Sequence, residues 1–184
     1  SARIDSLAAL VYWLGINPAI ESAPTNIWRR EMDVPSASGE FRTAVYGPTS
    51  GRVLGAYFVI QGMHYDGPSD PRMSRFLSVM ASAGFLVYAP YLTDLLRLRV
   101  TPESLQQCFD AFAHFLEHPR MPKGCRPALF SISYGSLFGF RVASHRDYRS
   151  RVGSLFVFGG YADWETSLRF ALTGLQGDVK LGQH

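Results

Sequence analysis

The sequence is notable first for what it lacks. Its 184 residues contain no apolar run of roughly 18 residues, so no helix that could cross a membrane is expected. Its start has no basic, apolar and small-residue signal pattern. Because the chain begins at Ser1 without methionine, export and localisation stay undecided. Two cysteines, Cys108 and Cys125, show neither C-x-x-C nor metal-ligand spacing, so free thiols are favoured over a bridge.

Ligand and partner signatures are also scarce. No G-x-G-x-x-G follows a predicted strand, no P-loop lysine is found, and potential metal ligands do not cluster, so no cofactor or metal is expected. The net charge is only +3, and the basic residues are scattered rather than gathered in a stripe. Nucleic acid is therefore not an expected partner.

The composition is that of one globular domain. Apolar residues make up 47% of the chain and charged residues 18%, which argues against disorder. We expect an N-terminal helical segment over 1–25, with its helix at 3–14, a core over 26–174 and a tail over 175–184.

Within the expected core, strands alternate with helices after a leading hairpin. This order predicts a mostly parallel sheet with helices on both faces. The strands are expected at 28–34, 41–46, 53–60, 85–89, 128–132 and 153–159. The helices are expected at 71–83, 102–117, 135–145 and 163–172. Ligands of such sheets bind at the carboxyl ends of the strands, where the loops 61–67, 90–100 and 131–136 fall.

The most informative segment is 128–140, in which a short apolar strand runs into Ser133 and a helical pattern begins at once. This is the arrangement of a nucleophile elbow, a tight strand-to-helix turn that exposes a serine hydroxyl above the sheet. Glycines normally frame such a serine because the turn is strained. Here the rear glycine is Gly135, but Ser131 occupies the front position. Alternatively, Ser133 is only a small residue that a tight turn requires.

The order of strand, glycine loop and serine elbow resembles that of the α/β-hydrolase superfamily. The resemblance extends from about Arg29 to Gly174 and ends after the sixth strand of that fold. More narrowly, the chain resembles bacterial dienelactone-hydrolase-like and esterase-like members. The segments that carry this narrower resemblance are 62–72, 83–85, 89–90 and 158–163.

The resemblance implies a role for several positions. Ser133 would be the nucleophile, and the backbone N–H groups of Tyr134 and Met63 would form the oxyanion hole. Gln61 stands where these enzymes usually have histidine, although a main-chain donor does not depend on that side chain. The loop around Gly62 could equally be a plain connection. Asp163 reads more readily as a helix N-cap than as a catalytic acid.

A catalytic histidine is missing where the superfamily has one, after the serine. His145 is twelve residues beyond Ser133, roughly 18 Å along a helix, and His184 is the terminal residue. His64 is at the correct end of the sheet and is a minor candidate for the base. The seventh and eighth strands are also not recognised after Gly174. The chain therefore looks partial, and an open sheet edge would invite a dimer or a partner chain.

These features lead to two functional hypotheses. The first is a serine hydrolase that acts on a carboxylic ester or related acyl substrate, a small molecule. The second is a non-catalytic hydrolase-like binding module, or a fragment that is inactive alone, which the missing base favours. Five tyrosines near strand ends would line the acyl pocket or merely pack at the edge of the core: Tyr65, Tyr88, Tyr91, Tyr134 and Tyr161.

Overall fold

A computed structural model of the protein describes residues 24–37, 39–160, 163–173, 175–176 and 179–180. The strands are β1 (Ile27–Ser36), β2 (Gly39–Pro48), β3 (Gly55–Ile60), β4 (Phe85–Pro90), β5 (Ala128–Ile132), β6 (Ser154–Phe158), β7 (Leu175–Gln176) and β8 (Val179–Lys180). The helices are α2 (Pro71–Ser82), α3 (Thr93–Leu96), α4 (Pro102–Leu116), α5 (Ser136–Ser144) and α6 (Trp164–Thr173). Two short 3-10 turns, η2 (Gly67–Ser69) and η3 (Ser133–Gly135), lie beside the candidate site.

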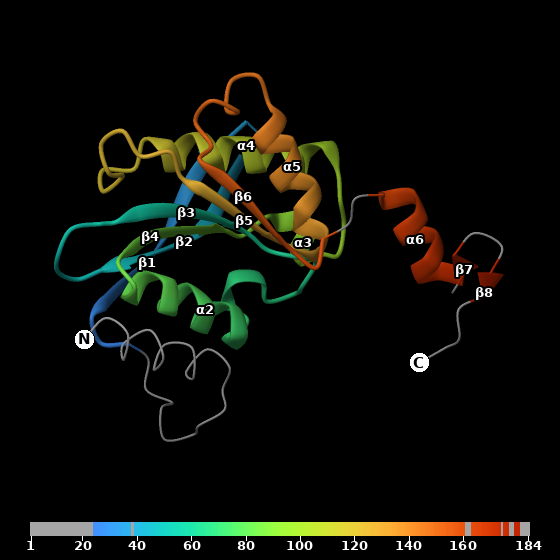
Figure 1. The fold of residues 1–184 in the computed structure, drawn as a ribbon, viewed down its shortest axis with the longest axis horizontal. Coiled ribbons are helices and arrows are strands. Elements are labelled where there is room, and N and C mark those ends of the chain that lie inside the picture. The colour runs from blue at the N-terminus through green and yellow to red at the C-terminus, as the bar shows by residue number, and fades with distance from the viewer. Residues whose placement is uncertain (1–23, 38, 161–162, 174, 177–178, 181–184) are drawn as a thin grey trace.

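Six strands form one mixed sheet in the order β1-β2-β4-β3-β5-β6. β1 pairs antiparallel with β2, and β2 antiparallel with β4. The pairs β3–β4, β3–β5 and β5–β6 are all parallel. The predicted fold class, a mostly parallel sheet with a leading antiparallel hairpin, is confirmed (Figure 1). Because β3 and β5 are parallel neighbours, the loops that follow them leave the sheet side by side.

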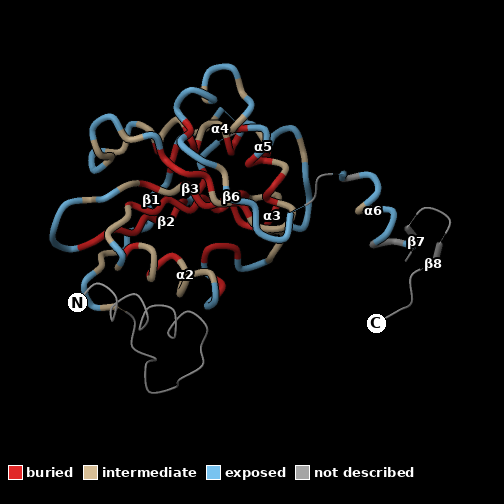
Figure 2. The backbone as a smooth tube through the Cα atoms, in the orientation of Figure 1, coloured by how far each residue is buried: buried red, intermediate tan, exposed pale blue. Residues whose placement is uncertain are grey.

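Helices cover both faces of this sheet. α2 lies on one face, and α4 and α5 lie on the other (Figure 1). The larger core cluster lies between α4, α5 and the sheet and includes stacked aromatic rings such as Phe58 and Tyr88. A smaller cluster forms under α2 around Leu77 and Val87. The buried residues concentrate along the central strands (Figure 2).

Sequence signals explain where the main helices begin. Pro71 and Pro102 each take the first helical position of α2 and α4, where a missing N–H costs nothing. Asp70 caps α2, and Thr101 forms a capping box with Ser104 at α4. These helices therefore begin where the sequence predicts.

Some elements differ from the expectation. The short helix α3 lies inside a segment read as a loop, and β7 pairs with β8 in a separate two-stranded sheet. The helix predicted over 3–14 lies outside the described residues. Within the described residues, no helix is both long and apolar enough to span a membrane. Cys108 and Cys125 are free thiols, as predicted.

Candidate active site

Ser133 occupies the turn between β5 and α5. Its φ of 49° lies in the left-handed region, which non-glycine residues seldom adopt. Such backbone costs about 1–3 kcal/mol and persists only where the surroundings impose it. The residue thus has the strained conformation expected of a serine at an elbow, at the carboxyl end of a central strand.

Glycines allow the β3 loop and this turn to touch. A Cβ on Gly135 would lie 2.3 Å from the backbone oxygen of Gln61, although the φ of Gly135, −60°, suits any residue. A Cβ on Gly62 would lie 3.2 Å from Ser133 Cβ and 3.3 Å from the Ile132 oxygen. The two backbones are therefore packed closely, and the main chain of the β3 loop passes directly beside the serine.

The front position of the elbow shows how a serine replaces the usual glycine. Ser131 is fully buried, and its hydroxyl donates to the Phe156 carbonyl oxygen at 3.2 Å. The space for its side chain comes from Gly139 in α5, where a Cβ would lie 2.9 Å from Ser131 Oγ. Gly139 was not singled out in the sequence, although it lies eight residues beyond Ser131, on the helix facing the strand. Gly139 in α5 therefore leaves the space that the Ser131 side chain needs in place of a glycine.

A cavity of about 580 Å³ opens between the β3 loop, α2 and the elbow. Three of the four predicted site residues line it, namely Ser133, Met63 and His64. Tyr134 follows Ser133 within η3 but is not among the lining residues. The remaining lining residues are five apolar side chains, Met73, Phe76, Phe130, Ile132 and Phe158, together with Gln61, Gly62, Gly67, Asp70 and Arg72.

The apolar wall is not built from the predicted tyrosines. Tyr65 is 72% exposed, and Tyr88 is fully buried with its hydroxyl 2.8 Å from His114 Nδ1. Tyr91 donates to Glu31 at 3.0 Å and also contacts the Ser69 hydroxyl. None of the described tyrosines lines the cavity, and Tyr161 lies outside the described residues. Side chains from α2, β5 and β6 supply the apolar surface instead.

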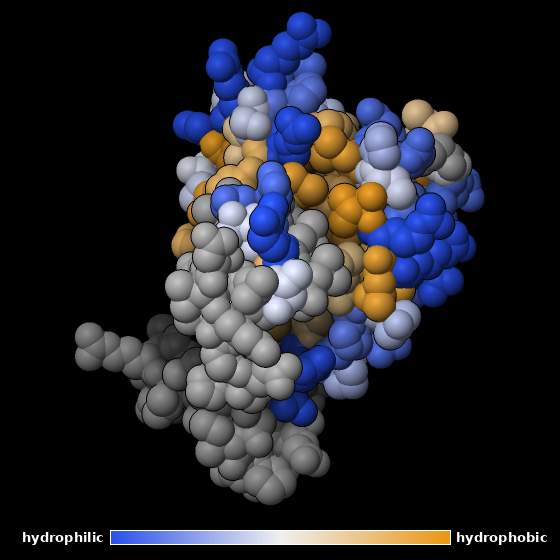
Figure 3. Space-filling view, turned by 90° about the vertical axis from the view of Figure 1, so that its right-hand side faces the viewer, coloured by the Kyte–Doolittle hydropathy of each residue, from blue (hydrophilic) through white to orange (hydrophobic). Residues whose placement is uncertain are grey.

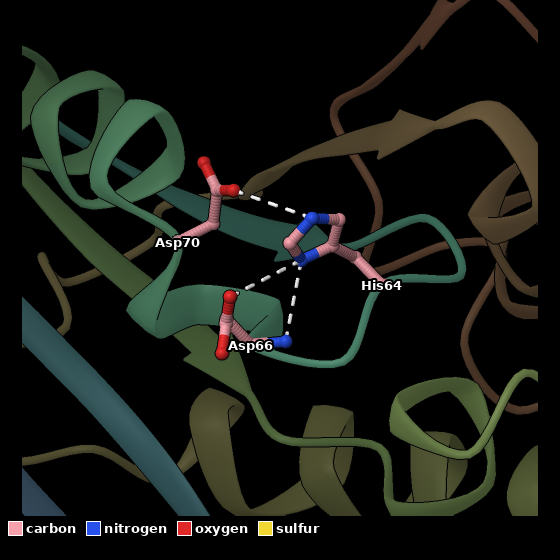
Figure 4. Close-up of side chains that lie close together, drawn as sticks. All are labelled: His64, Asp66 and Asp70. Carbon is pink, nitrogen blue, oxygen red and sulfur yellow. Dashed lines mark hydrogen bonds and ion pairs between the residues drawn. The ribbon is translucent and has the colours of Figure 1, made fainter.

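His64 points toward two aspartates (Figure 4). Its Nδ1 accepts from the Asp66 backbone N–H at 3.2 Å, and its Nε2 lies 3.4 Å from Asp70 Oδ2. Asp70 is itself fixed, because Arg72 donates from Nε and Nη2 to its two carboxylate oxygens at 3.1 and 3.0 Å. Hydrogen bonds from Arg72 lower the pKa of Asp70 to about 2. His64 thus ties the loop after β3 to the N-terminus of α2.

The same three side chains form the group best suited to a metal among the described residues. One ligand atom from each of His64, Asp66 and Asp70 lies within 4.8 Å of the others. However, Arg72 occupies both oxygens of Asp70, and the Asp66 N–H occupies His64 Nδ1. A cation would have to displace these bonds, so the arrangement fits an ion-paired clamp better than a metal centre.

The other described candidates for a catalytic acid or base, Asp163 and His145, make capping and packing contacts. Asp163 precedes α6 and accepts from the Thr166 backbone N–H at 3.0 Å, as an N-cap does. His145 ends α5 and packs against Phe109 and Tyr148. His184 lies outside the described residues.

The side of the cavity next to β6 is open. Phe156, Val157 and Phe158 are 47%, 39% and 63% exposed, and β6 is the last strand of the described sheet. On the side of the molecule where β6 ends, apolar surface lies exposed between hydrophilic side chains (Figure 3). Such exposure is unusual for aromatic residues at the end of a sheet.

Comparison with known proteins gives a fold but no close relative. No family model matches the sequence, and no curated protein matches it. Among solved structures, brefeldin A esterase, described as a bacterial homologue of human hormone-sensitive lipase, has a TM-score of 0.65 at 16% identity, covering 93% of this chain and 53% of its own. Esterase Est22 has a TM-score of 0.66 at 14% identity, with coverage of 86% and 52%. The acylaminoacyl peptidase of Pyrococcus horikoshii has a TM-score of 0.62 at 18% identity, with coverage of 79% and 25%.

These likenesses establish that the chain has the α/β-hydrolase fold, as its sequence predicted. The chain spans about half the length of the two esterases and a quarter of the peptidase.

Proposed function

We propose that this α/β-hydrolase fold carries a serine hydrolase site for a small carboxylic ester or related acyl substrate. The observation that carries the proposal is the close contact between the loop after β3 and the turn after β5 that holds Ser133. Ser133 has a left-handed φ, opens onto the cavity and lies directly against Gly62 of the β3 loop. A serine in that place faces a cavity large enough for an acyl group, and its neighbours Met63 and Tyr134 would supply the main-chain N–H donors. The known activities of the structural neighbours, esterase and peptidase, agree with acyl transfer.

In the proposed reaction, Ser133 Oγ attacks the substrate carbonyl carbon and loses its proton to a base. The N–H groups of Met63 and Tyr134 donate to the developing oxyanion, a contribution of about 3–4 kcal/mol for each good donor. The alcohol then leaves with the returned proton, and an acyl-enzyme on Ser133 remains. Water hydrolyses that ester and regenerates the serine. The narrower resemblance to dienelactone-hydrolase-like enzymes remains a prediction.

The proposed reaction needs a base that can reach Ser133 Oγ. His64 is the one histidine among the described residues that line the cavity, which makes it the candidate by location. In the structure its Nδ1 bonds to the Asp66 backbone N–H and its Nε2 faces the Asp70 carboxylate. His64 would therefore need to turn its ring to take a proton from Ser133. This geometry favours the second candidate function, a binding module that uses the same cavity without catalysis.

The decisive experiment is intact-mass spectrometry after incubation with a fluorophosphonate, with Ser133→Ala as the negative control. A stoichiometric adduct that the variant lacks is the expected result, because only an activated serine beside an oxyanion hole reacts quickly. Ser136→Ala, three residues along, is a matched control that should keep the adduct. No adduct on the folded wild-type chain would reject hydrolysis by this chain and leave the binding module or a fragment that is inactive alone. Slow labelling in His64→Gln with unchanged folding would identify His64 as the base.

We also propose that the edge of β6 pairs with another strand, from a second copy or a partner chain. The support is the exposure of Phe156, Val157 and Phe158 on the last strand of the described sheet. A strand paired there would cover these side chains and close the open side of the cavity.

A further inference from the structure

A second cavity lies at the opposite end of the sheet from Ser133. It has a volume of about 810 Å³ and shares no lining residue with the cavity at Ser133. Its walls come mainly from β1, the outermost strand at that end of the sheet, and from the C-terminal end of α4 and the residues that follow it. This β1–α4 cavity is therefore separate from the proposed site of acyl transfer.

Basic side chains gather around the β1–α4 cavity, namely Arg30, His114, His118 and Arg120. Both arginines are exposed, so a ligand can reach them. The Arg120 guanidinium lies over the Trp28 ring, 5.0 Å from its centroid, and donates to the Pro48 carbonyl oxygen at 3.5 Å. The Arg30 side chain makes no hydrogen bond or ion pair with the other described residues. Most of the N–H donors of the two guanidinium groups are thus left for a ligand.

The two imidazole rings add further donors. Nδ1 of His114 lies 2.8 Å from the Tyr88 hydroxyl, and Nδ1 of His118 accepts from the Arg120 backbone N–H at 3.2 Å. Within the described part of the chain, neither Nε2 has a partner, and neither is among the polar atoms that are closed off from solvent. Because a backbone N–H can only donate, neutral His118 carries its proton on Nε2. Burial, His114 and Arg120 lower the pKa of His118, so these surroundings already oppose another positive charge.

The charges around the cavity do not cancel. Glu117 also lines it, so two guanidinium groups face one carboxylate and leave one net positive charge. Glu31 borders the cavity too, but its Oε1 accepts from Arg29 at 2.6 Å and from the Tyr91 hydroxyl at 3.0 Å. Tyr91 belongs to the cluster under α2, on the other face of the sheet from α4. The carboxylate of Glu31 is therefore turned away from the arginines of this cavity.

We propose that the β1–α4 cavity binds an organic carboxylate, whose charged group is held by Arg30, Arg120 and His118. Guanidinium groups bind carboxylates through paired, charge-assisted hydrogen bonds. One net positive charge matches one carboxylate better than it matches a phosphate group, which carries nearly two negative charges. Trp28 and Met32 line the cavity from the same face of β1 as Arg30 and offer apolar surface to the rest of the ligand.

Calorimetry with phenylacetate tests the proposal, because this probe joins one carboxylate to an apolar ring. Phenylacetamide has nearly the same shape without the charge, and acetate has the charge without the ring. We expect phenylacetate to bind with a Kd of about 1 mM or lower, and at least about tenfold more tightly than either of the other two compounds. Equal affinity for phenylacetate and phenylacetamide, or no binding of phenylacetate at about 10 mM, would overturn the proposal.

Charge-matched variants test the named residues. Arg30→Gln and Arg120→Gln should each weaken phenylacetate binding about five- to tenfold. Arg149→Gln is the control, because it removes the same charge from an exposed arginine that does not line the cavity, and it should bind as the wild type does. Because Arg120 packs on Trp28, Arg30→Gln decides the test if Arg120→Gln fails to fold. Unchanged binding in Arg30→Gln would overturn the proposal.

The imidazole NMR signals, assigned with His→Gln variants, locate the bound probe. Phenylacetate should shift the signals of His114 and His118 and leave that of His64 in place. A shift confined to His64 would put the anion in the cavity at Ser133 and overturn the proposal, as would a response of His114 and His118 to Zn²⁺ but not to phenylacetate. Ser133→Ala should bind phenylacetate as the wild type does, so this result does not depend on acyl transfer.

Discussion

On one side of the cavity, the loop after β3 and the turn after β5 meet backbone against backbone; on the other side, β6 ends in aromatic side chains that face solvent. At the first side, Gly135 allows a contact that no larger residue would permit, and a Cβ on Gly62 would crowd Ser133 and Ile132 at 3.2 and 3.3 Å. At the second, Phe158 is 63% exposed although it lines the same cavity. The chain thus specifies the nucleophile side closely and leaves the β6 side open, and substitutions on the two sides should have very different costs.

The largest effect is expected at Gly135. Its helical φ suits alanine, but an added Cβ would lie 2.3 Å from the Gln61 backbone oxygen, which cannot move without shifting the loop. We expect Gly135→Ala to lower the free energy of unfolding by about 3 kcal/mol, the upper end for overpacking. Urea unfolding measures this. Gly55→Ala is the control, because its Cβ would meet only the Phe85 ring, at 3.4 Å. Equal losses in the two variants would contradict the close packing of the elbow.

The second effect tests the pairing of Ser131 with Gly139. Gly139→Ala would place a Cβ 2.9 Å from the buried Ser131 hydroxyl, and we expect a loss of about 2 kcal/mol. In the Ser131→Gly background the same substitution should cost at least about 1 kcal/mol less, because the contacts with the Ser131 side chain are gone and only Leu155 Cδ1, at 3.2 Å, stays close. A double-mutant cycle of unfolding free energies measures this coupling. Additive effects would show that the two residues do not compensate each other.

These two sites also mark how far the sequence can predict the structure. The strand 128–132, the elbow at Ser133 and the capped starts of α2 and α4 follow from local signals, namely an apolar run, turn chemistry and Pro-capping residues. The space that Gly139 leaves for Ser131 does not follow from local signals, because it depends on which face of α5 packs against β5. The same holds for His64: its position at the right end of the sheet is predictable, but its bonds to Asp66 and Asp70 depend on the path of the loop.

A smaller effect is expected from the clamp at Asp70. The pKa of folded Asp70 is about 2, below the ordinary value of 3.8, so the carboxylate stabilises the fold above about pH 4 and loses this contribution as pH falls toward 2. Since Arg72 is largely exposed, solvent screening reduces the gain, and we expect Asp70→Asn to cost about 1 kcal/mol at pH 7. Unfolding free energies of the two proteins should converge between pH 4 and about pH 2. A constant difference between the two unfolding free energies over that pH range would show that the ion pair of Asp70 with Arg72 does not cause the loss.

The smallest effect on folding is expected at β6. Phe158 is 63% exposed, and Phe156 is 47% exposed with ring contacts, among the described residues, only to Tyr57 and Phe130, so replacing either by lysine should change the free energy of unfolding by less than about 1 kcal/mol. The consequence should appear in association instead, because a charge on an edge strand opposes pairing with another chain. Sedimentation velocity of the wild type at rising concentration should show self-association that Phe156→Lys weakens. Phe140→Lys is a matched control, since Phe140 is 45% exposed but lies on α5 rather than on the edge strand. If Phe156→Lys instead destabilised the fold by several kcal/mol, β6 would be packed in solution as tightly as the elbow, and the contrast between the two sides would fail.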